Sequence, residues 1–343
     1  AFRAVALFVR DRRTLGWAAA VFAAIGLGIW AVGFISTDWT MKFPGLAPLV
    51  RRLPSALVAL PGSPDSGISA NQLAGALVLY LPVALALLIA CIRARRPGWA
   101  LATLGAAGAI GATLVLTQSR SGWLGSAAGL IGLAVIAGWT TRRRSVRLAA
   151  LALPVVVIAG VGILLTSRPE LVTAFISPAR ETGGEITLSG RPEIWSRALY
   201  AIQDFSFTGT GLGTFRRIVN LLYPLFAISP QYDIAHAHNI FLQVALDLGL
   251  PGLIAYLACL WVALATAWNT ARRSAGVVRA LALGLLTGLI ALHIYGLTDA
   301  IALGAKPGVA FWMALGLLAA LSRVAASPPG EDARPVGLAA LPK

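Results

Sequence analysis

Two of the three histidines in this chain lie one residue apart in the segment AHAHN, where a polar stretch passes into a long apolar run. Histidine can take or give a proton near neutral pH, so His236 and His238 are candidates for a general base. Metal binding is not expected. Asp233 is the only acidic residue at ligand spacing from them, and His293 lies far off in another apolar run. A structural role for both rings stays open.

Arginine side chains form a second set of candidates. Arg120 stands alone between two apolar runs, and the polar segment before the histidines contains Arg191, Arg197, Arg216 and Arg217 among its arginines. A guanidinium group binds two phosphate oxygens at once, so arginines gathered at one end of a membrane protein suit a fixed anion such as a diphosphate. The alternative is that each side chain only extends to the membrane surface.

Three polar residues follow the histidines at helical spacing. If a helix starts at Asn239, then Asn239, Gln243 and Asp247 fall on one face of it. A polar stripe in an apolar helix must face the protein interior, and hydrogen bonds between helices are the favoured interpretation. The glycine-rich stretch GTGLGTF at 209–215 lacks the ending of a nucleotide-binding loop, and a tight turn is expected there.

The elements that must position these residues are membrane helices. The chain has 343 residues, of which 58% are hydrophobic and 12% charged, with a mean hydropathy of +0.80. Charged residues make up about a quarter of a soluble domain, so this composition indicates an all-α polytopic membrane protein. Eight apolar runs are long enough to span a bilayer: 15–36, 72–92, 97–116, 122–138, 148–166, 240–267, 280–297 and 308–323.

The net charge of +15 does not indicate nucleic acid, because the basic residues cluster in alternate connections between the spans. Such a bias predicts that these connections and both termini are cytoplasmic and lie near anionic lipid. The other connections are then external: 37–71, 117–121, 167–239 and 298–307.

One membrane domain is expected over 1–325, with a disordered cytoplasmic tail at 326–343. Its largest external loop is 167–239, in which ETGGEITLSG reads as irregular. After it, a helix start at Ser189 and Pro192 predicts an amphipathic helix over RPEIWSRALYAIQDF, and RRIVNLLYPLF is a second amphipathic run.

His238 and Asn239, followed after nine residues by Gly249 and after two more by Gly252, resemble the pattern of the O-antigen ligase and O-antigen polymerase family of integral membrane glycosyltransferases. Further similar elements are SRSGWLG at 119–125, GRPEIW at 190–195, FTGTGLGTF at 207–215 and SANQLAG at 69–75. The family has about twelve spans, with roughly nine before the large loop, whereas five precede it here. An N-terminally truncated chain is therefore expected.

The resemblance implies an enzyme that transfers a glycan from undecaprenyl diphosphate to a hydroxyl of a glycan or glycolipid acceptor, with inversion and without a metal or other cofactor. It assigns the base to His238 and the diphosphate to Arg120 and Arg191, with Arg216 or Arg217 assisting; Asn239, His236, Gln243 and Asp247 are supporting residues. The expected location is the bacterial inner membrane, with the site facing the periplasm.

Two other functions stay open. A polymerase of the same family uses the same donor and differs only in the acceptor. A secondary transporter would also have many spans, but its polar groups gather near the bilayer midplane, whereas the candidates here gather at one mouth of the bundle.

Overall fold

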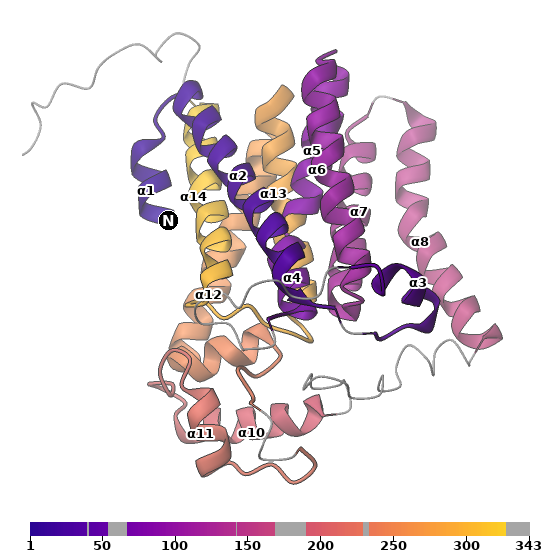
Figure 1. Cartoon of the computed structure of the whole chain (residues 1–343). Coiled ribbons are helices and arrows are strands. Elements are labelled where there is room, and N and C mark those ends of the chain that lie inside the picture. Colours follow the sequence, from indigo (N-terminus) through magenta and orange to yellow (C-terminus); the bar gives the residue numbers. More distant parts are fainter. Residues whose placement is uncertain (40, 54–66, 142, 169–189, 229–232, 327–343) are drawn as a thin grey trace, which may run out of the picture.

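The computed structural model describes residues 1–39, 41–53, 67–141, 143–168, 190–228 and 233–326, and these are almost entirely helical (Figure 1). Eight helical segments within them are long and apolar enough to cross a membrane. The prediction of an all-α polytopic membrane protein is therefore confirmed. The segments are α2 (Arg12–Ser36), α4 with α5 (Ala70–Leu77 and Tyr80–Arg93), α6 (Pro97–Leu116), α7 (Arg120–Trp139), α8 (Arg144–Ser167), α12 (Ile240–Arg273), α13 (Gly276–Tyr295) and, after the short turn η2 (Lys306–Gly308), α14 (Val309–Ala326).

Three features were not predicted from the sequence. Helix α12 runs 34 residues, beyond the expected 240–267. A short helix α1 (Phe2–Phe8) packs along α14, where Gly316 lets the main chain of α1 approach closely. Two short strands, β1 (Thr37–Asp38) and β2 (Ile68–Ser69), pair in parallel. Helix α1 and the two strands are too short for hydrophobic periodicity to reveal, and tertiary contacts stabilise them.

Helix α13 lies at the centre of the bundle, packed against α5, α7 and α12. Small residues of α7 permit this: a Cβ atom on Gly125 would lie 2.5 Å from the carbonyl oxygen of Ala291, and one on Gly129 would lie 2.9 Å from that of Thr287. Since lipid tails are as apolar as the side chains, close packing of small residues is what holds membrane helices together. Helix α8 lies at the edge, with Ala150 its one buried residue.

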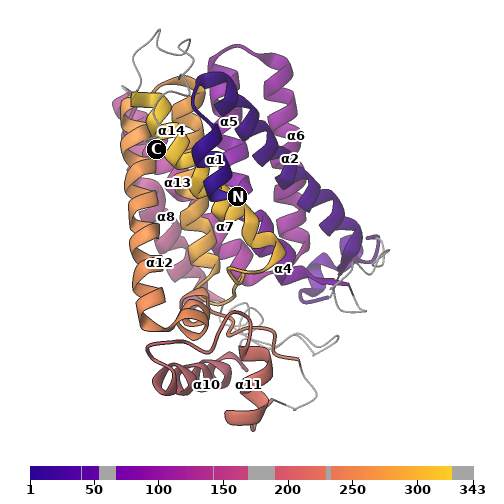
Figure 2. The same cartoon turned by 90° about the vertical axis from the view of Figure 1, so that its left-hand side faces the viewer.

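Two amphipathic helices, α10 (Arg191–Asp204) and α11 (Phe215–Leu222), lie outside the bundle at one end (Figures 1 and 2). Both were predicted, although α11 ends at Leu222 because Pro224 follows two residues later. Their apolar faces form a small core of their own with the start of α12, through Ile194, Phe215 and Leu246. We call this the loop end of the molecule.

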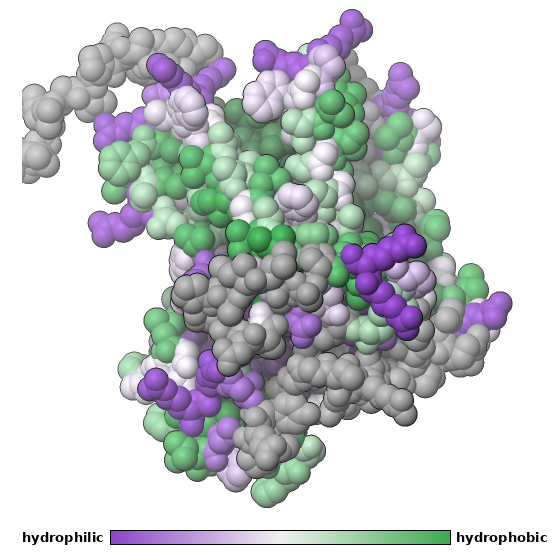
Figure 3. Space-filling model, viewed as in Figure 1, coloured by the Kyte–Doolittle hydropathy of each residue, from purple (hydrophilic) through white to green (hydrophobic). Residues whose placement is uncertain are grey.

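The opposite end carries the connections from α5 to α6, from α7 to α8 and from α12 to α13. We call it the arginine end, after Arg93, Arg143 and Arg279. Figure 3 shows hydrophilic residues along this rim and apolar residues over the middle of the bundle below it. The predicted tail after Ala326, most of the irregular stretch ETGGEITLSG and the proposed cap Ser189 lie outside the described residues.

A short 3-10 turn, η1 (Pro44–Leu46), and helix α3 (Ala47–Val50) complete the elements at the loop end. They belong to the connection between α2 and α4. Phe43 and Lys42, just before them, both donate backbone N–H groups to Oε1 of Gln118, at 2.6 and 2.9 Å. This connection is thereby tied to the residues directly before α7.

Candidate functional site

His238 is positioned by the start of α12. Asn239 caps this helix, accepting hydrogen bonds from the N–H groups of Phe241 and Leu242 at 2.9 and 3.0 Å. His238 itself has a left-handed backbone conformation, with φ at 48°, which is uncommon for a residue other than glycine. Its carbonyl oxygen accepts a hydrogen bond from the indole of Trp195, at 3.3 Å. The backbone of His238 is therefore held by the helix cap that follows it and by the hydrogen bond from Trp195.

The same cap ties His238 to a second segment. The Asn239 side-chain amide donates to the carbonyl oxygen of Leu297 at 2.9 Å, and the Ile240 N–H donates to that of Gly296 at 2.7 Å. These bonds hold the turn after α13 against the start of α12. Asp299, in that turn, therefore lies beside the histidines, its Oδ1 3.3 Å from Nδ1 of His238 and 3.9 Å from Nε2 of His236.

Arg191, the first residue of α10, completes the cluster. Its guanidinium lies 3.5 Å from Oδ2 of Asp299, and both side chains are nearly inaccessible, at 6% and 3% exposed. Helix α10 holds it there through the Trp195 contact with His238 and through its apolar face. A buried carboxylate is stable only when paired with cations, so Asp299 and Arg191 depend on each other.

The surroundings of His236 and Asp299 shift the pKa values of both groups. Burial, with the neighbouring charges of His238 and Arg191, lowers the pKa of His236 to about 4, so this ring is neutral near pH 7. Burial alone would raise the pKa of Asp299. The contacts with His238, His236 and Arg191 outweigh burial and hold that pKa below its usual value. The carboxylate is therefore ionised, and it faces Nδ1 of His238.

Arg120 lies at the start of α7, with Ser119 as the cap of that helix. Its guanidinium lies 5.7 Å from the centre of the Phe43 ring and is close enough to Arg191 for their charges to repel. The adjacent hydroxyl of Ser121 hydrogen-bonds that of Thr298 at 2.7 Å, which joins this helix start to the turn carrying Asp299. The structure thus brings Arg120 to the same end as Arg191 and His238.

The polar stripe on α12 has a packing role. Gln243 accepts from the N–H of Ala237 at 2.9 Å and donates to Oδ1 of Asp247 at 2.8 Å. Asp247 in turn accepts from the N–H of Gly213 at 3.1 Å, in the stretch GTGLGTF. That stretch is a turn, as predicted, and Asp247 anchors it to the helix.

Gly249, which belongs to the pattern that follows His238 in the sequence, lies where α12 crosses another segment closely. It interrupts α12 with φ at 70°, and a Cβ atom there would lie 2.5 Å from the carbonyl oxygen of Phe207. Gly209 meets it from the other side: a Cβ atom on Gly209 would lie 2.5 Å from the N atom of Gly249. Only glycine fits where these two segments cross.

The remaining arginines of the loop end are arranged differently. Arg216 is exposed and pairs with Asp233, and Arg217 is exposed on the same helix. Arg197 lies 3.9 Å from Glu193 within α10 and stacks on Tyr200 and Phe226. None of these three has a contact with Asp299 or the histidines among the described residues.

The histidines also supply possible metal ligands. Ligand atoms of His236, His238 and Asp299 lie within 4.8 Å of one another. The acidic member is Asp299 and not Asp233, the only candidate that the sequence offered. The guanidinium of Arg191 lies 3.5 Å from the other oxygen of this carboxylate, and a cation beside the carboxylate opposes the binding of a second cation.

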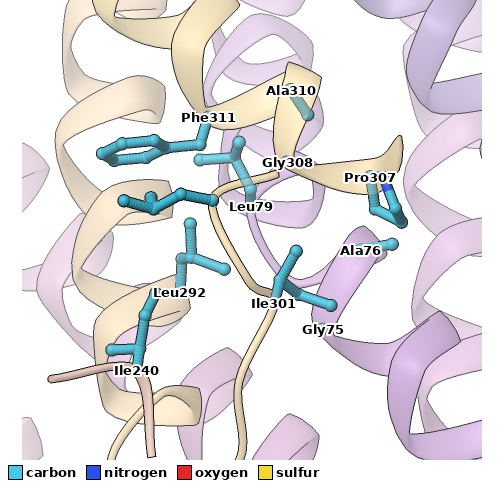
Figure 4. A pocket seen from close by; sticks show the side chains of 11 residues that line it. Gly75, Ala76, Leu79, Ile240, Leu292, Ile301, Pro307, Gly308, Ala310 and Phe311 are labelled. Atoms are coloured by element: carbon cyan, nitrogen blue, oxygen red, sulfur yellow. The ribbon is translucent and has the colours of Figure 1, made fainter. Parts of the chain in front are cut away.

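An apolar pocket lies between the start of α12 and the η2 turn, lined among others by Ile240, Ile301, Pro307 and Phe311 (Figure 4). It adjoins the cluster through Ile240 and Ile301, each two residues from a cluster member. Its volume of about 20 Å³ admits a single water molecule at most, so it cannot hold a lipid chain. It is a small packing defect.

Three buried polar atoms at the cluster have no hydrogen-bond partner among the described residues: Nε of Arg191, Nδ1 of His238 and Oδ2 of Asp299. Native proteins satisfy nearly all buried polar atoms, so such a group calls for an explanation. Here Nε of Arg191, Nδ1 of His238 and one oxygen of Asp299 lie in one cluster, and the His238 side chain is 14% exposed. The arrangement suits a polar, anionic ligand that enters from the surface.

The sequence did not single out Asp299. A signal was available, because it is the one acidic residue in the connection 298–307 and follows directly after a span. An isolated carboxylate at the edge of a membrane bundle needs a cationic partner.

Fold and site together define a polytopic membrane protein with a buried histidine, arginine and aspartate centre at one end of its bundle. Residues 105–257 match the family model described as O-antigen ligase, a range that contains Arg120, Arg191 and His238 but not Asp299. Over this range the chain is similar to the O-antigen ligase family. It is 33% identical over 229 residues to an O-antigen ligase of Pseudomonas aeruginosa, an alignment covering 65% of this chain. That alignment covers 49% of the relative, so the chain spans about half of its length.

Proposed function

We propose that this protein transfers a glycan from undecaprenyl diphosphate to a hydroxyl group of an acceptor at the outer face of the bacterial inner membrane. The observation that carries the proposal is the set of unpartnered buried atoms on Arg191, His238 and Asp299. Two arginines against one carboxylate leave a positive centre, and the departing diphosphate of such a donor is an anion.

His238 is the base in this proposal. Its Nδ1 faces the ionised Asp299, which leaves Nε2 to accept a proton. As the acceptor oxygen attacks the anomeric carbon, its proton passes to Nε2 of His238. The bond from that carbon to the diphosphate oxygen breaks, and the bonding electrons leave with the diphosphate. Asp299 orients the ring and stabilises the imidazolium that forms, as a buried carboxylate does beside other catalytic histidines.

Arg191 and Arg120 stabilise the leaving group. Arg191 contacts Asp299 through one nitrogen, and its Nε has no partner among the described residues, so the group can hold the carboxylate and a phosphate oxygen together. Negative charge grows on the diphosphate as the bond breaks, and fixed cations stabilise this change without rearrangement. A diphosphate leaves readily, so this chemistry requires no metal.

The direct test supplies purified protein with lipid-linked glycan and candidate acceptors, and identifies the product by mass spectrometry. A product joined to a lipid A core acceptor supports a ligase, and a lengthened lipid-linked glycan supports a polymerase. The reaction is expected to proceed in a metal chelator. Loss of activity in chelator, restored by a divalent cation, would assign His236, His238 and Asp299 to a metal instead.

Sidedness has its own test. Single cysteines replace Ser206, exposed at the loop end, and Ser145, exposed at the arginine end, in a chain lacking the free Cys91 and Cys259. An impermeant thiol reagent applied to intact cells is expected to label the cysteine at 206 only. The opposite pattern would place the site in the cytoplasm and contradict a donor in the outer leaflet.

A further inference from the structure

The arginine end of the bundle contains a hollow that the proposed function does not use. Two adjoining cavities, of about 280 and 500 Å³, lie between α5, α7 and α13 and share Arg93, Arg279 and Thr140 in their walls. They lie at the opposite end of these helices from the histidine cluster. A ligand bound in this hollow would therefore not take part in the transfer reaction.

The charged side chains that line the outer cavity are all basic. Arg93, Arg143 and Arg279 line it, and no Asp or Glu is among its lining residues within the described chain. None of the three guanidinium groups has an ion pair among the described residues. Like charges around one space repel each other, so an anion between them is stabilising.

Two further groups at the same place are suited to an anion. Ser274 is among the residues that line the outer cavity, and its hydroxyl oxygen is buried without a hydrogen-bond partner among the described residues. Helix α13 begins at Gly276 in the same wall, and no side chain caps it. The first N–H groups of this 20-residue helix thus lack a side-chain cap, and such groups at a helix start favour a nearby anion.

The inner cavity is of a different kind. Its lining is largely aliphatic, including Ile89, Ala90, Leu133 and Leu283, and it continues from the arginines toward the middle of the bundle. A free phosphate would fill the outer cavity and leave this apolar surface uncovered. A molecule with an anionic head and a hydrocarbon chain covers both.

We infer that this hollow binds an anionic glycerophospholipid, with its phosphate between Arg93, Arg143 and Arg279 and part of an acyl chain against Ala90 and Leu133. Basic pockets between membrane helices are a recurrent way to hold such headgroups. The bound lipid joins α5, α7 and α13 at the end where the three connections between helices are short. Phosphatidylglycerol is a suitable probe.

Native mass spectrometry of the purified protein in detergent tests the inference. Phosphatidylglycerol is expected to stay bound in preference to phosphatidylethanolamine. The double variant Arg93→Gln/Arg279→Gln is expected to weaken retention roughly 10- to 30-fold, since each arginine near a lipid surface contributes about 1 kcal/mol. Arg13→Gln, an exposed arginine of the same end, is the matched control and should retain the lipid as the wild type does.

A second variant separates a lipid from a free anion. Ala90→Phe fills the apolar cavity and leaves every charge in place, so it should weaken phosphatidylglycerol binding. Glycerophosphoglycerol, the headgroup without chains, should compete poorly in the wild type. Equal retention of both lipids, an unchanged double variant, or full competition by the soluble headgroup would each overturn the inference. Unfolding temperatures measured without lipid check that all variants are folded.

Discussion

The two ends of the helix bundle hold arginine side chains in different ways. At the loop end, Arg191 is buried, pairs with Asp299 and belongs to a helix outside the bundle. At the arginine end, Arg93 and Arg143 are exposed, each beside the end of its own helix, and have no acidic partner among the described residues. Arg191 is thus held by an ion pair inside the protein, whereas Arg93 and Arg143 lie at the surface without one among the described residues.

This difference separates a cation that the fold pairs internally from cations whose charge is open to solvent or to a ligand. A buried arginine costs free energy, which only a fixed counter-charge or a bound ligand can offset. An exposed arginine costs little and needs neither. Variants at the loop end should therefore change activity or folding strongly, and equivalent variants at the arginine end should not.

The largest effect is expected from His238→Ala. Removing a general base costs about 10² to 10⁴-fold in rate, while donor binding should persist because both arginines remain. His236→Ala should keep at least roughly a tenth of wild-type activity, since this ring is neutral and its Nδ1 accepts a hydrogen bond from the backbone N–H of His238. Transfer rates at saturating donor, with donor binding measured separately, check the pair. An active His238→Ala with a wild-type pH profile would place the base elsewhere.

Asp299→Asn is expected to affect folding as well as transfer. Breaking a buried ion pair by removing one partner costs about 3–5 kcal/mol, because Arg191 keeps its charge in a closed environment. The thermal unfolding midpoint in detergent should fall clearly. Asp233→Asn, whose carboxylate pairs with exposed Arg216, is the control and should change it little. Equal midpoints for the two variants would show that the Asp299 network contributes no stability.

Replacing either site arginine with lysine should lower transfer activity by a smaller factor. Arg120→Lys and Arg191→Lys keep the charge and lose the planar pair of donors, so transfer should fall about tenfold or more, equivalent to about 1.4 kcal/mol. Arg197→Lys should be mild, because Arg197 stacks on aromatic rings away from the cluster. If all three variants lose the same activity, the diphosphate is not held by a specific pair.

Lowering the pH should reduce the stability of the folded protein through protonation of His236. Its pKa in the folded protein, about 4, lies below the ordinary value of 6.5, so the unfolded chain binds more protons between these values. Stability contributed by the neutral ring is present above pH 6.5 and is lost as the pH falls from 6.5 toward 4. Unfolding midpoints across this range should decline in the wild type and decline less in His236→Gln. Parallel curves would assign the acid sensitivity to another group.

The smallest effect is expected at the arginine end. Arg13→Gln removes an exposed charge, and such surface changes usually stay within about 0.5 kcal/mol. Transfer activity and the unfolding midpoint should match the wild type. A loss of activity as large as that of Arg191→Lys would remove the contrast between the two ends.

Much of the fold could be predicted because membrane spans are encoded locally. A run of apolar residues long enough to cross the bilayer must be helical, since no water is present to satisfy its backbone. The two amphipathic helices were predicted for a similar reason, as their periodicity is a property of each segment alone. The short helix α1 and the β1–β2 pair were missed, because contacts with distant segments stabilise them.

The sequence by itself determined the helical membrane architecture and, through its resemblance to a known family, nominated His238, Arg120 and Arg191. Only the tertiary structure decided that Asp299 completes the cluster, that Arg216 pairs with Asp233 at the surface, and that Asp247 anchors a turn. The physical reason is that charge pairing in a bundle depends on which helix ends meet, and here the hydrogen bonds from Asn239 and Ile240 to the turn after α13 determine that meeting.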